Sequence, residues 1–492
     1  MALEHLSHSP DSVPEAHPDV QELITGEGPL LPVVFRLAGP VVLMMYLQGA
    51  YNIIDTIWVG QLLGKLSLAG IATGGFVLWS IFGLTSLVSV GTSAMLARRI
   101  GEGNLAKAEY VAAKGLCWAL LLSVFVGSVL WFLVPTLFRL MGTNPEVTEL
   151  GSTYLRVILL GCPLIFLSFT LQRIFQAEGD TVTPMWLMFF TLLINTALDP
   201  VLMLGMFGFP KLGVGGAALA TVIARFFMVA FGIWLLVRKR RIQTRRFRYA
   251  LLRYIPHSRP VIAGGRLRLR LDETTTPDWG LFGSMLRIGI PMTVSQVLFP
   301  FVYMIITRLP AAYGPEYIAA LRIGHTVEGV SFFLALGFSI ATATCLGQNL
   351  GAGKPARAAR AGWIATEIVV AILFVFSVLF YLFSSQIGSV FSPDIDAIKA
   401  SATYLEILAF SQVFMGIEIV LAGAFSGAGD TVPPMVITVP FNLARIPLAY
   451  LLAGSLGLGI NGVWWTISGT SIAKGLIIAF WFYRGRWKSK NV

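Results

Sequence analysis

The chain alternates long apolar runs with short polar connections. A run of about 20 apolar residues is long enough for a helix to cross a bilayer. The first half contains six such runs, at residues 31–58, 66–97, 114–137, 153–178, 184–206 and 214–237. The second half also contains six, at residues 281–309, 316–347, 362–384, 402–427, 434–455 and 461–483. The pattern therefore predicts an all-α membrane protein with twelve transmembrane helices.

Two polar motifs each occur twice, and both pairs have the same separation. GDTVTPM begins at Gly179 and GDTVPPM begins at Gly429, which is 250 residues further on. RIGEGN at 99–104 and NLGAGK at 349–354 keep the same separation. Aspartate followed by a hydroxyl residue and proline is typical of a helix start. Two unrelated turn motifs at one offset indicate an internal duplication, so we expect two six-helix lobes.

The composition supports a membrane protein. Hydrophobic residues make up 56% of the chain and charged residues 12%, against about 25% charged in soluble domains. The net charge of +11 could suggest a nucleic-acid partner, but most of the basic excess lies in loops, so we expect none. None of the three cysteines has a CxxC partner, so neither a disulfide framework nor a zinc site is expected.

The distribution of Lys and Arg predicts the orientation in the membrane. Basic residues gather in the connections 98–114, 238–270 and 348–360 and at the C-terminus. The opposite loops hold few cations beyond Lys65, Arg139, Lys211 and Lys399. Because cytoplasmic loops carry the excess of Lys and Arg, both termini should be cytoplasmic, in the inner (plasma) membrane.

We divide the chain into five parts. They are a cytoplasmic tail at 1–28, an N-terminal lobe at 29–237, a basic cytoplasmic linker at 238–280, a C-terminal lobe at 281–483 and a basic cytoplasmic tail at 484–492. The first tail lacks the apolar core of a signal peptide, and we expect it to be mobile. The linker is interpreted as a solvated segment that sets the topology, with binding of DNA or lipid phosphate as the alternative.

One polar stripe lies on the first predicted helix. Gln48, Tyr51 or Asn52, and Asp55 are three or four residues apart, so they share a helix face. An ionisable side chain in mid-membrane is costly unless it is paired or hydrated, which makes Asp55 a functional candidate. We expect the stripe to line a cavity. The alternative is a hydrogen-bonded stripe that only holds helices together.

A second carboxylate lies in the fifth predicted helix. Asn195 and Asp199 are four residues apart, and Pro200 cannot donate a hydrogen bond to the carbonyl of Thr196. A carboxylate, an amide oxygen and a free carbonyl suit sodium, because hard cations take oxygen ligands. They equally suit a proton-binding site. The alternative is a proline kink beside a fully hydrogen-bonded aspartate.

The second half does not repeat these acids. The 250-residue offset places Ile305 opposite Asp55 and Ala449 opposite Asp199. This asymmetry favours a cation site confined to the first lobe.

The second half has ionisable candidates of its own, Glu328, Glu418 and Arg445. One interpretation is a buried ion pair of Arg445 with one of the glutamates. The other is that a glutamate contacts a cationic substrate in the cavity. The chain has no Walker loop, HExxH or GxSxG motif, so we expect neither an enzyme nor a cofactor.

Several motifs in order resemble the multidrug and toxic compound extrusion (MATE) family of antiporters, from about residue 30 to 483. The motifs are Asn52–Gly60 (NIIDTIWVG), Gly179–Pro184 (GDTVTP), Asn195–Pro200 (NTALDP) and Gly347–Gly353 (GQNLGAG). Arg322-Ile323 followed by Glu328 is most similar to the prokaryotic DNA-damage-inducible branch.

The resemblance implies two lobes meeting in a V around a central cleft. It also implies export of amphipathic, often cationic compounds in exchange for protons or sodium. In such relatives the positions of Asp55, Asn195 and Asp199 form the cation site, where sodium would bind, and the hydroxyl of Thr221 joins it. The positions of Gln48 and Tyr51 line the cavity. We expect small-molecule partners, the lipid bilayer and a monomer.

Two rival functions are distinguishable. A lipid-linked precursor flippase of the same superfamily would need cationic residues in the central cavity to hold a pyrophosphate. A membrane-embedded enzyme would need a cluster of histidines or acids at one membrane face. The candidates in the first lobe are acids, and no such cluster is apparent in the sequence.

Overall fold

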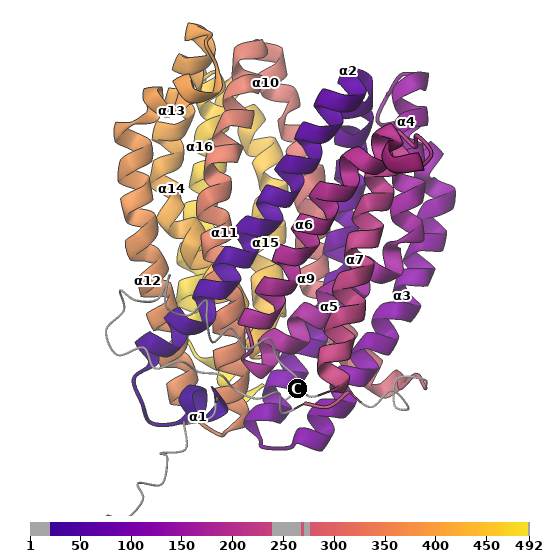
Figure 1. Cartoon of the computed structure of the whole chain (residues 1–492). Coiled ribbons are helices and arrows are strands. Elements are labelled where there is room, and N and C mark those ends of the chain that lie inside the picture. The colour runs from indigo at the N-terminus through magenta and orange to yellow at the C-terminus, as the bar shows by residue number, and fades with distance from the viewer. Residues whose placement is uncertain (1–19, 239–266, 270–275, 491–492) are drawn as a thin grey trace, which may run out of the picture.

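The computed structural model describes residues 20–238, 267–269 and 276–490, and every regular element in this part of the chain is a helix (Figure 1). The first half contains α1 (Val20–Thr25), α2 (Leu30–Gly101), α3 (Leu105–Leu140), α4 (Pro145–Leu160), α5 (Cys162–Glu178), α6 (Val182–Leu204), η1 (Met206–Gly208) and α7 (Val214–Val237). The second half contains α9 (Trp279–Ile306), α10 (Arg308–Tyr313), α11 (Pro315–Gly351), α12 (Pro355–Leu382), α13 (Ser384–Phe391), α14 (Ile395–Gly427), α15 (Val432–Tyr450), η3 (Leu451–Ser455), α16 (Ile460–Tyr483) and η4 (Arg486–Ser489).

The number of spans agrees with the prediction. Among the described residues, ten helices are long and apolar enough to cross a membrane, and α4 with α5 forms an eleventh span bent by 56°. At 1.5 Å per residue the 72 residues of α2 would extend about 108 Å, far more than the roughly 30 Å hydrocarbon core. The backbone of α2 breaks at Gly64 (φ +82°, ψ −176°), so α2 holds two spans. This break falls between the predicted helices 31–58 and 66–97.

Large apolar side chains on the outer helices are exposed. Phe125 and Phe132 on α3 and Phe374 on α12 have 66%, 80% and 61% of their surface uncovered. A water-soluble monomer rarely leaves such side chains uncovered over a continuous surface, whereas lipid covers them in a membrane.

Four helices begin about two turns or more earlier than the apolar runs predict. Their first residues are Leu105 in α3, Pro145 in α4, Pro355 in α12 and Ile395 in α14. The added turns are polar, so hydropathy does not detect them. Local caps stabilise two of them: Asn104 accepts a hydrogen bond from the Lys107 N–H (3.1 Å), and Asp394 accepts one from the Asp396 N–H (3.1 Å).

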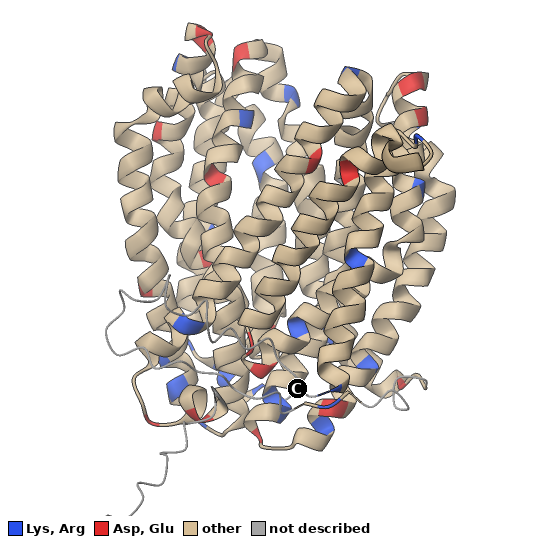
Figure 2. Cartoon of the chain, viewed as in Figure 1, with Lys and Arg blue, Asp and Glu red and all other residues tan. Residues whose placement is uncertain are grey.

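Lys and Arg gather at the end of the bundle that carries α1 and the C-terminus, which we call the basic end (Figure 2). There α2 and α11 cross without side chains between them. A Cβ on Gly101 would collide with the carbonyl of Gln348, and a Cβ on Gly351 with the carbonyl of Arg98. Gly351 and Gln348 each lie 250 residues after Gly101 and Arg98, so the two contacts are equivalent. The internal duplication is therefore also visible in the packing, as a pseudo-two-fold axis between α2 and α11.

Each half packs its first helix against the other half. Leu37 and Ala38 of α2 belong to the apolar core around Phe338 of α11, and Met285 and Ile288 of α9 belong to the core of the first half. Contacts between the halves extend up to Tyr46, whose hydroxyl donates to the Val330 carbonyl (2.9 Å), and to Gly83 beside Val297. This arrangement fits the expected V, closed at the basic end.

The expectation of a mobile tail over residues 1–28 is wrong for residues 20–25, and residues 1–19 lie outside the described part. Helix α1 contacts both halves at the basic end. The Gln21 amide donates to the Ile100 carbonyl (2.6 Å), and the Ile24 carbonyl accepts from Asn349 (3.2 Å) and Arg357 (3.1 Å). The Ile24 side chain is fully buried, which stabilises the docked helix.

Most of the predicted linker, residues 239–266 and 270–275, lies outside the described part. Residues 267–269 are not the solvated segment that we expected. The Leu267 N–H donates to Glu178 (3.2 Å), the Arg268 N–H donates to Glu109 (2.7 Å), and the side chains of Leu267 and Leu269 are buried in the core of the first half. The C-terminal tail is anchored as well, since the buried Trp487 stacks on Phe482 with ring centroids 4.7 Å apart.

Candidate cation and substrate site

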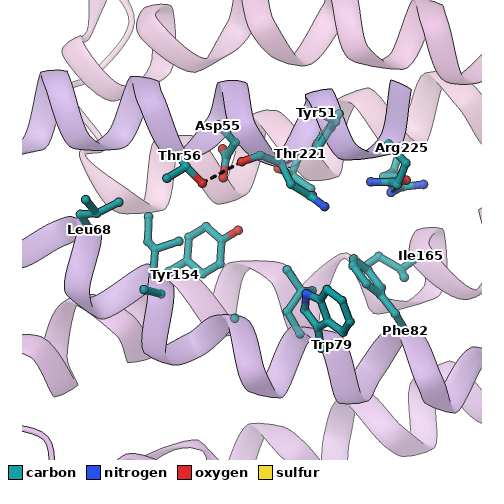
Figure 3. A pocket seen from close by; sticks show the side chains of 16 residues that line it. Tyr51, Asp55, Thr56, Leu68, Trp79, Phe82, Tyr154, Ile165, Thr221 and Arg225 are labelled. Carbon is teal, nitrogen blue, oxygen red and sulfur yellow. Dashed lines mark hydrogen bonds between the residues drawn. The ribbon is translucent and has the colours of Figure 1, made fainter. Parts of the chain in front are cut away.

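A cavity of about 280 Å³ lies between the two spans of α2 and is closed by α4, α5 and α7 (Figure 3). The fold-back of α2 at Gly64 creates it, because residues 48–56 and 68–82 come to face each other. The residues that line it are Gln48, Tyr51, Asn52, Asp55, Thr56, Leu68, Ile71, Ala72, Gly75, Leu78, Trp79, Phe82, Tyr154, Ile165, Thr221 and Arg225. The predicted polar stripe therefore faces a cavity.

Asp55 lies in the cavity wall and is 8% exposed. Its Oδ1 has no hydrogen-bond partner among the described residues. One turn earlier, the Tyr51 hydroxyl donates to the Thr221 hydroxyl of α7 (3.0 Å), which places Thr221 beside the stripe. The structure thus brings Asp55 and Thr221, two of the residues that the resemblance assigns to one site, to the same cavity.

Asn195 and Asp199 lie behind the cavity wall and are fully buried in α6. The Asn195 amide donates to Asp199 Oδ1 (3.1 Å), while Asp199 Oδ2 and Asn195 Oδ1 have no partner in the described part of the chain. Asp55 is close enough to Asp199 for their charges to interact. Within the described part of the chain, Asp199 is therefore not fully hydrogen-bonded.

The donor set suits a small hard cation. Asp55, Asn195 and Asp199 each offer one buried oxygen that has no partner among the described residues, and oxygen is the ligand that sodium takes. The same oxygens would also stabilise a proton shared by the two carboxylates. No group of three His, Cys, Asp or Glu side chains that could hold a metal ion occurs in the described residues.

Sequence reasoning missed Arg225, a cation in the same cavity. It is 2% exposed, its Nη2 donates to Gln48 Oε1 (3.2 Å), its Nη1 donates to the Ser168 hydroxyl (3.4 Å), and its guanidinium lies 5.9 Å from the centre of the Tyr51 ring. The signal was present, because Arg225 lies in the middle of the apolar run 214–237. The rule that singled out the intramembrane acids applies equally to cations.

The candidates of the second half lie apart from this cavity. Glu418 pairs with Lys474 (2.9 Å), whose ammonium also donates to Asn442 (3.3 Å), and Thr438 donates to Glu418 (3.1 Å). Lys474 was missed for the same reason as Arg225. Neither Glu328 nor Glu418 lines the cavity.

The predicted ion pair of Arg445 with a glutamate is wrong for the described residues. Its guanidinium instead donates to the hydroxyls of Thr470 (2.8 Å), Ser471 (2.8 Å) and Tyr303 (3.1 Å). The N–H groups of Arg445 are therefore occupied by neutral oxygens, and Glu418 pairs with Lys474 instead. Glu328 is half-buried on α11, near enough to Arg445 and Lys474 to interact with their charges.

The MatE family model matches residues 40–201 and 291–451, one match in each half. The chain belongs to the MatE family.

Relatives of this MatE-family chain match nearly its full length. A probable multidrug resistance protein NorM of Thermotoga maritima is 28% identical, over 93% of both chains. An FAD transporter of Shewanella oneidensis is 26% identical, over 87% of this chain and 86% of its own. The assignment to the DNA-damage-inducible branch stays a prediction.

The fold of this MatE protein agrees with that of solved structures. A multidrug resistance MATE family transporter in an outward-facing conformation superimposes with a TM-score of 0.82 at 24% identity, covering 96% of this chain and 99% of its own. The all-α fold that the apolar pattern predicts is therefore confirmed.

Proposed function

We propose that this MatE-family protein is a secondary active antiporter that exports amphipathic, often cationic compounds in exchange for protons or sodium. The observation that carries the proposal is the position of Asp55. It faces the cavity on one side and interacts with the buried Asp199 on the other. A cation bound there and a substrate in the cavity would share one wall. The name of the relative from Thermotoga maritima, a probable multidrug resistance protein, supports export of drug-like compounds.

Exchange requires only that each ligand bind the two states of the transporter with different affinity. A proton or sodium ion at Asp55 and Asp199 neutralises charge in a buried site. This changes which packing of α2 is stable, and α2 contains Pro40, where a helix bends most readily. Substrate in the cavity contacts the same stretch of α2 and favours the other state. Both ligands then act on the two spans of α2, and each ligand stabilises a different arrangement of these spans.

The same proposal places the protein in the inner membrane with the basic end in the cytoplasm. The support is the charge distribution: the turns at Arg98–Arg99 and Arg357–Arg360 and the segment Arg484–Lys490 all lie at the basic end (Figure 2). A lipid-linked precursor flippase is not favoured, since the relatives reported above carry the names of drug and FAD transporters.

The test is transport by the purified protein in sealed vesicles, with a proton gradient and a sodium gradient imposed in separate experiments. Ethidium is the first probe. We expect one of the two gradients to drive ethidium against its own concentration gradient, and dissipation of that gradient to stop it. Transport that ignores both gradients and instead requires a nucleotide would overturn the proposal.

A further inference from the structure

We propose that the cavity recognises an anionic group as well as a cationic one, and that Arg225 is the residue that binds it. The preferred ligands are then aromatic zwitterions that carry a carboxylate. This inference rests on the proposed function, because it names the substrate class of the same cavity. It differs from the expectation that the sequence raised, which was a cavity lined by acids for organic cations.

Arg225 is a buried cation without a counter-ion in the described part of the chain. Its two hydrogen-bond acceptors, Gln48 Oε1 and the Ser168 hydroxyl, are neutral, and its buried Nε has no partner. Removing a charge from water is costly unless an opposite charge or several hydrogen bonds replace the water. The Arg225 guanidinium lies at the cavity wall, so a ligand in the cavity could supply the negative charge that the described residues do not.

Two buried cations in the second half, Lys474 and Arg445, find their partners within the protein. Lys474 has Glu418 at 2.9 Å, and Arg445 donates to three hydroxyl groups. Neither lines the cavity. Arg225 differs from both, since it is incompletely hydrogen-bonded and lines the cavity.

Asp55 does not neutralise Arg225. Arg225 contacts Gln48, and Asp55 follows seven residues later on the same helix, which is about 10 Å along its axis. The described ion pairs do not join the two side chains, and Asp55 Oδ1 has no partner of its own. The guanidinium and the carboxylate therefore line the cavity at separate places along one wall (Figure 3).

Aromatic side chains line the cavity beside and opposite these two charges. Tyr51, Trp79, Phe82 and Tyr154 line the cavity and offer flat apolar surfaces to a ring system (Figure 3). A volume of about 280 Å³ admits one ligand of modest size. A carboxylate matches the single charge of Arg225, whereas a phosphate dianion would bring a second charge with no partner. The geometry thus fits a flat aromatic body with a carboxylate at the Arg225 end and a cationic group at the Asp55 end.

A biphenyl with an aminomethyl group at one end and a carboxylic acid at the other, and its methyl ester, make a matched pair of probes small enough for a cavity of about 280 Å³. They share the aromatic body and the ammonium group at neutral pH, but only the acid has a free carboxylate. We would measure the binding of each probe to the purified full-length protein by isothermal titration calorimetry at neutral pH. We expect the wild type to bind the acid at least about tenfold more tightly than the ester, which is the value of one hydrogen-bonded charge contact.

Substitutions then test whether Arg225 causes the preference. Arg225→Gln should weaken binding of the acid about tenfold and should strengthen binding of the cationic ester, because a like charge is removed. Arg225→Lys should keep part of the preference. Arg156→Gln removes a cation from the exposed surface of α4 in the same lobe, outside the cavity, and should leave the preference as in the wild type.

The outcomes separate this inference from the proposed function. Equal affinity of the wild type for the acid and the ester, or an Arg225→Gln protein that keeps the preference, would overturn the role of Arg225 even if gradient-driven transport is observed. A preference that depends on Arg225 supports the inference. Should the wild type show that preference but no gradient-driven transport of ethidium or of either probe, the antiport proposal would fail while the carboxylate subsite stands.

Discussion

Two sets of ionisable side chains inside the membrane differ in how far the described residues satisfy them. In the second half, Glu418 and Lys474 neutralise each other, and Arg445 is surrounded by hydroxyl groups. In the first half, Asp55 and Asp199 each keep an oxygen without a partner among the described residues. Side chains that satisfy one another stabilise a fold, whereas buried groups left half-satisfied need a ligand to complete them. The first half is therefore where ligands should bind.

The Glu418–Lys474 pair predicts a stability effect. Lys474→Met should lower the free energy of unfolding by about 3–5 kcal/mol, because it leaves the Glu418 carboxylate buried without its partner. The double variant Glu418→Gln, Lys474→Met should recover part of this loss. The free energy of unfolding of the two single variants and of the double variant is measured in detergent, with intrinsic tryptophan fluorescence as the signal. If the double variant is destabilised by the sum of the two single changes, the pair has no coupling and the interpretation is wrong.

At the scale of elements, apolar runs located the membrane spans because burial in lipid requires long uninterrupted apolar helices. The same rule could not detect α1, which has six residues and owes its docking to partners such as Ile100 and Asn349 far along the chain. The carboxylates were found from sequence as charges in apolar runs. Arg225 and Lys474 carried the same signal, but their significance depends on which partners the fold supplies, and only the structure shows this.

The crossing of α2 and α11 at the basic end predicts a conformational effect. Gly101→Ala places a methyl group against the backbone carbonyl of Gln348, so the two helices must separate. Spin labels at Lys107 and Arg360, both exposed at the basic end, should report a longer distance in this variant. Gly39→Ala on the same helix has open space around it and should leave the distance as in the wild type. An unchanged distance in Gly101→Ala would show that the crossing does not hold the basic end closed.

The whole molecule is a duplicated scaffold with unequal halves. The equivalent glycine contacts of α2 and α11 preserve the symmetry, while the acids at Asp55 and Asp199 have Ile305 and Ala449 at the matching positions. The halves thus share the close crossing of α2 and α11 and differ in the acids that we propose as the cation site. Duplicated halves moving about a central site are a common design of secondary transporters.

Orientation is a property of the whole molecule, and surface labelling tests it. All three native cysteines are buried, so a single introduced cysteine reports its own position. In intact cells a membrane-impermeant maleimide should label a cysteine at Glu146, which is exposed at the end opposite the basic end, and should not label one at Lys107. The reverse labelling pattern would place the basic end outside the cell.

Cation coupling through Asp55 is tested most directly by Asp55→Asn in sealed vesicles under the gradient that drives the wild type. The variant keeps the shape of the side chain but can no longer change charge. We expect it to reach the membrane in normal amounts and to lose the gradient-driven part of ethidium transport, because a cation can no longer bind the two states with different affinity through the charge of this side chain. Glu146→Gln, which removes an exposed acid of the same lobe, should transport as the wild type does. Gradient-driven transport by Asp55→Asn at the wild-type rate would contradict a coupling role for Asp55.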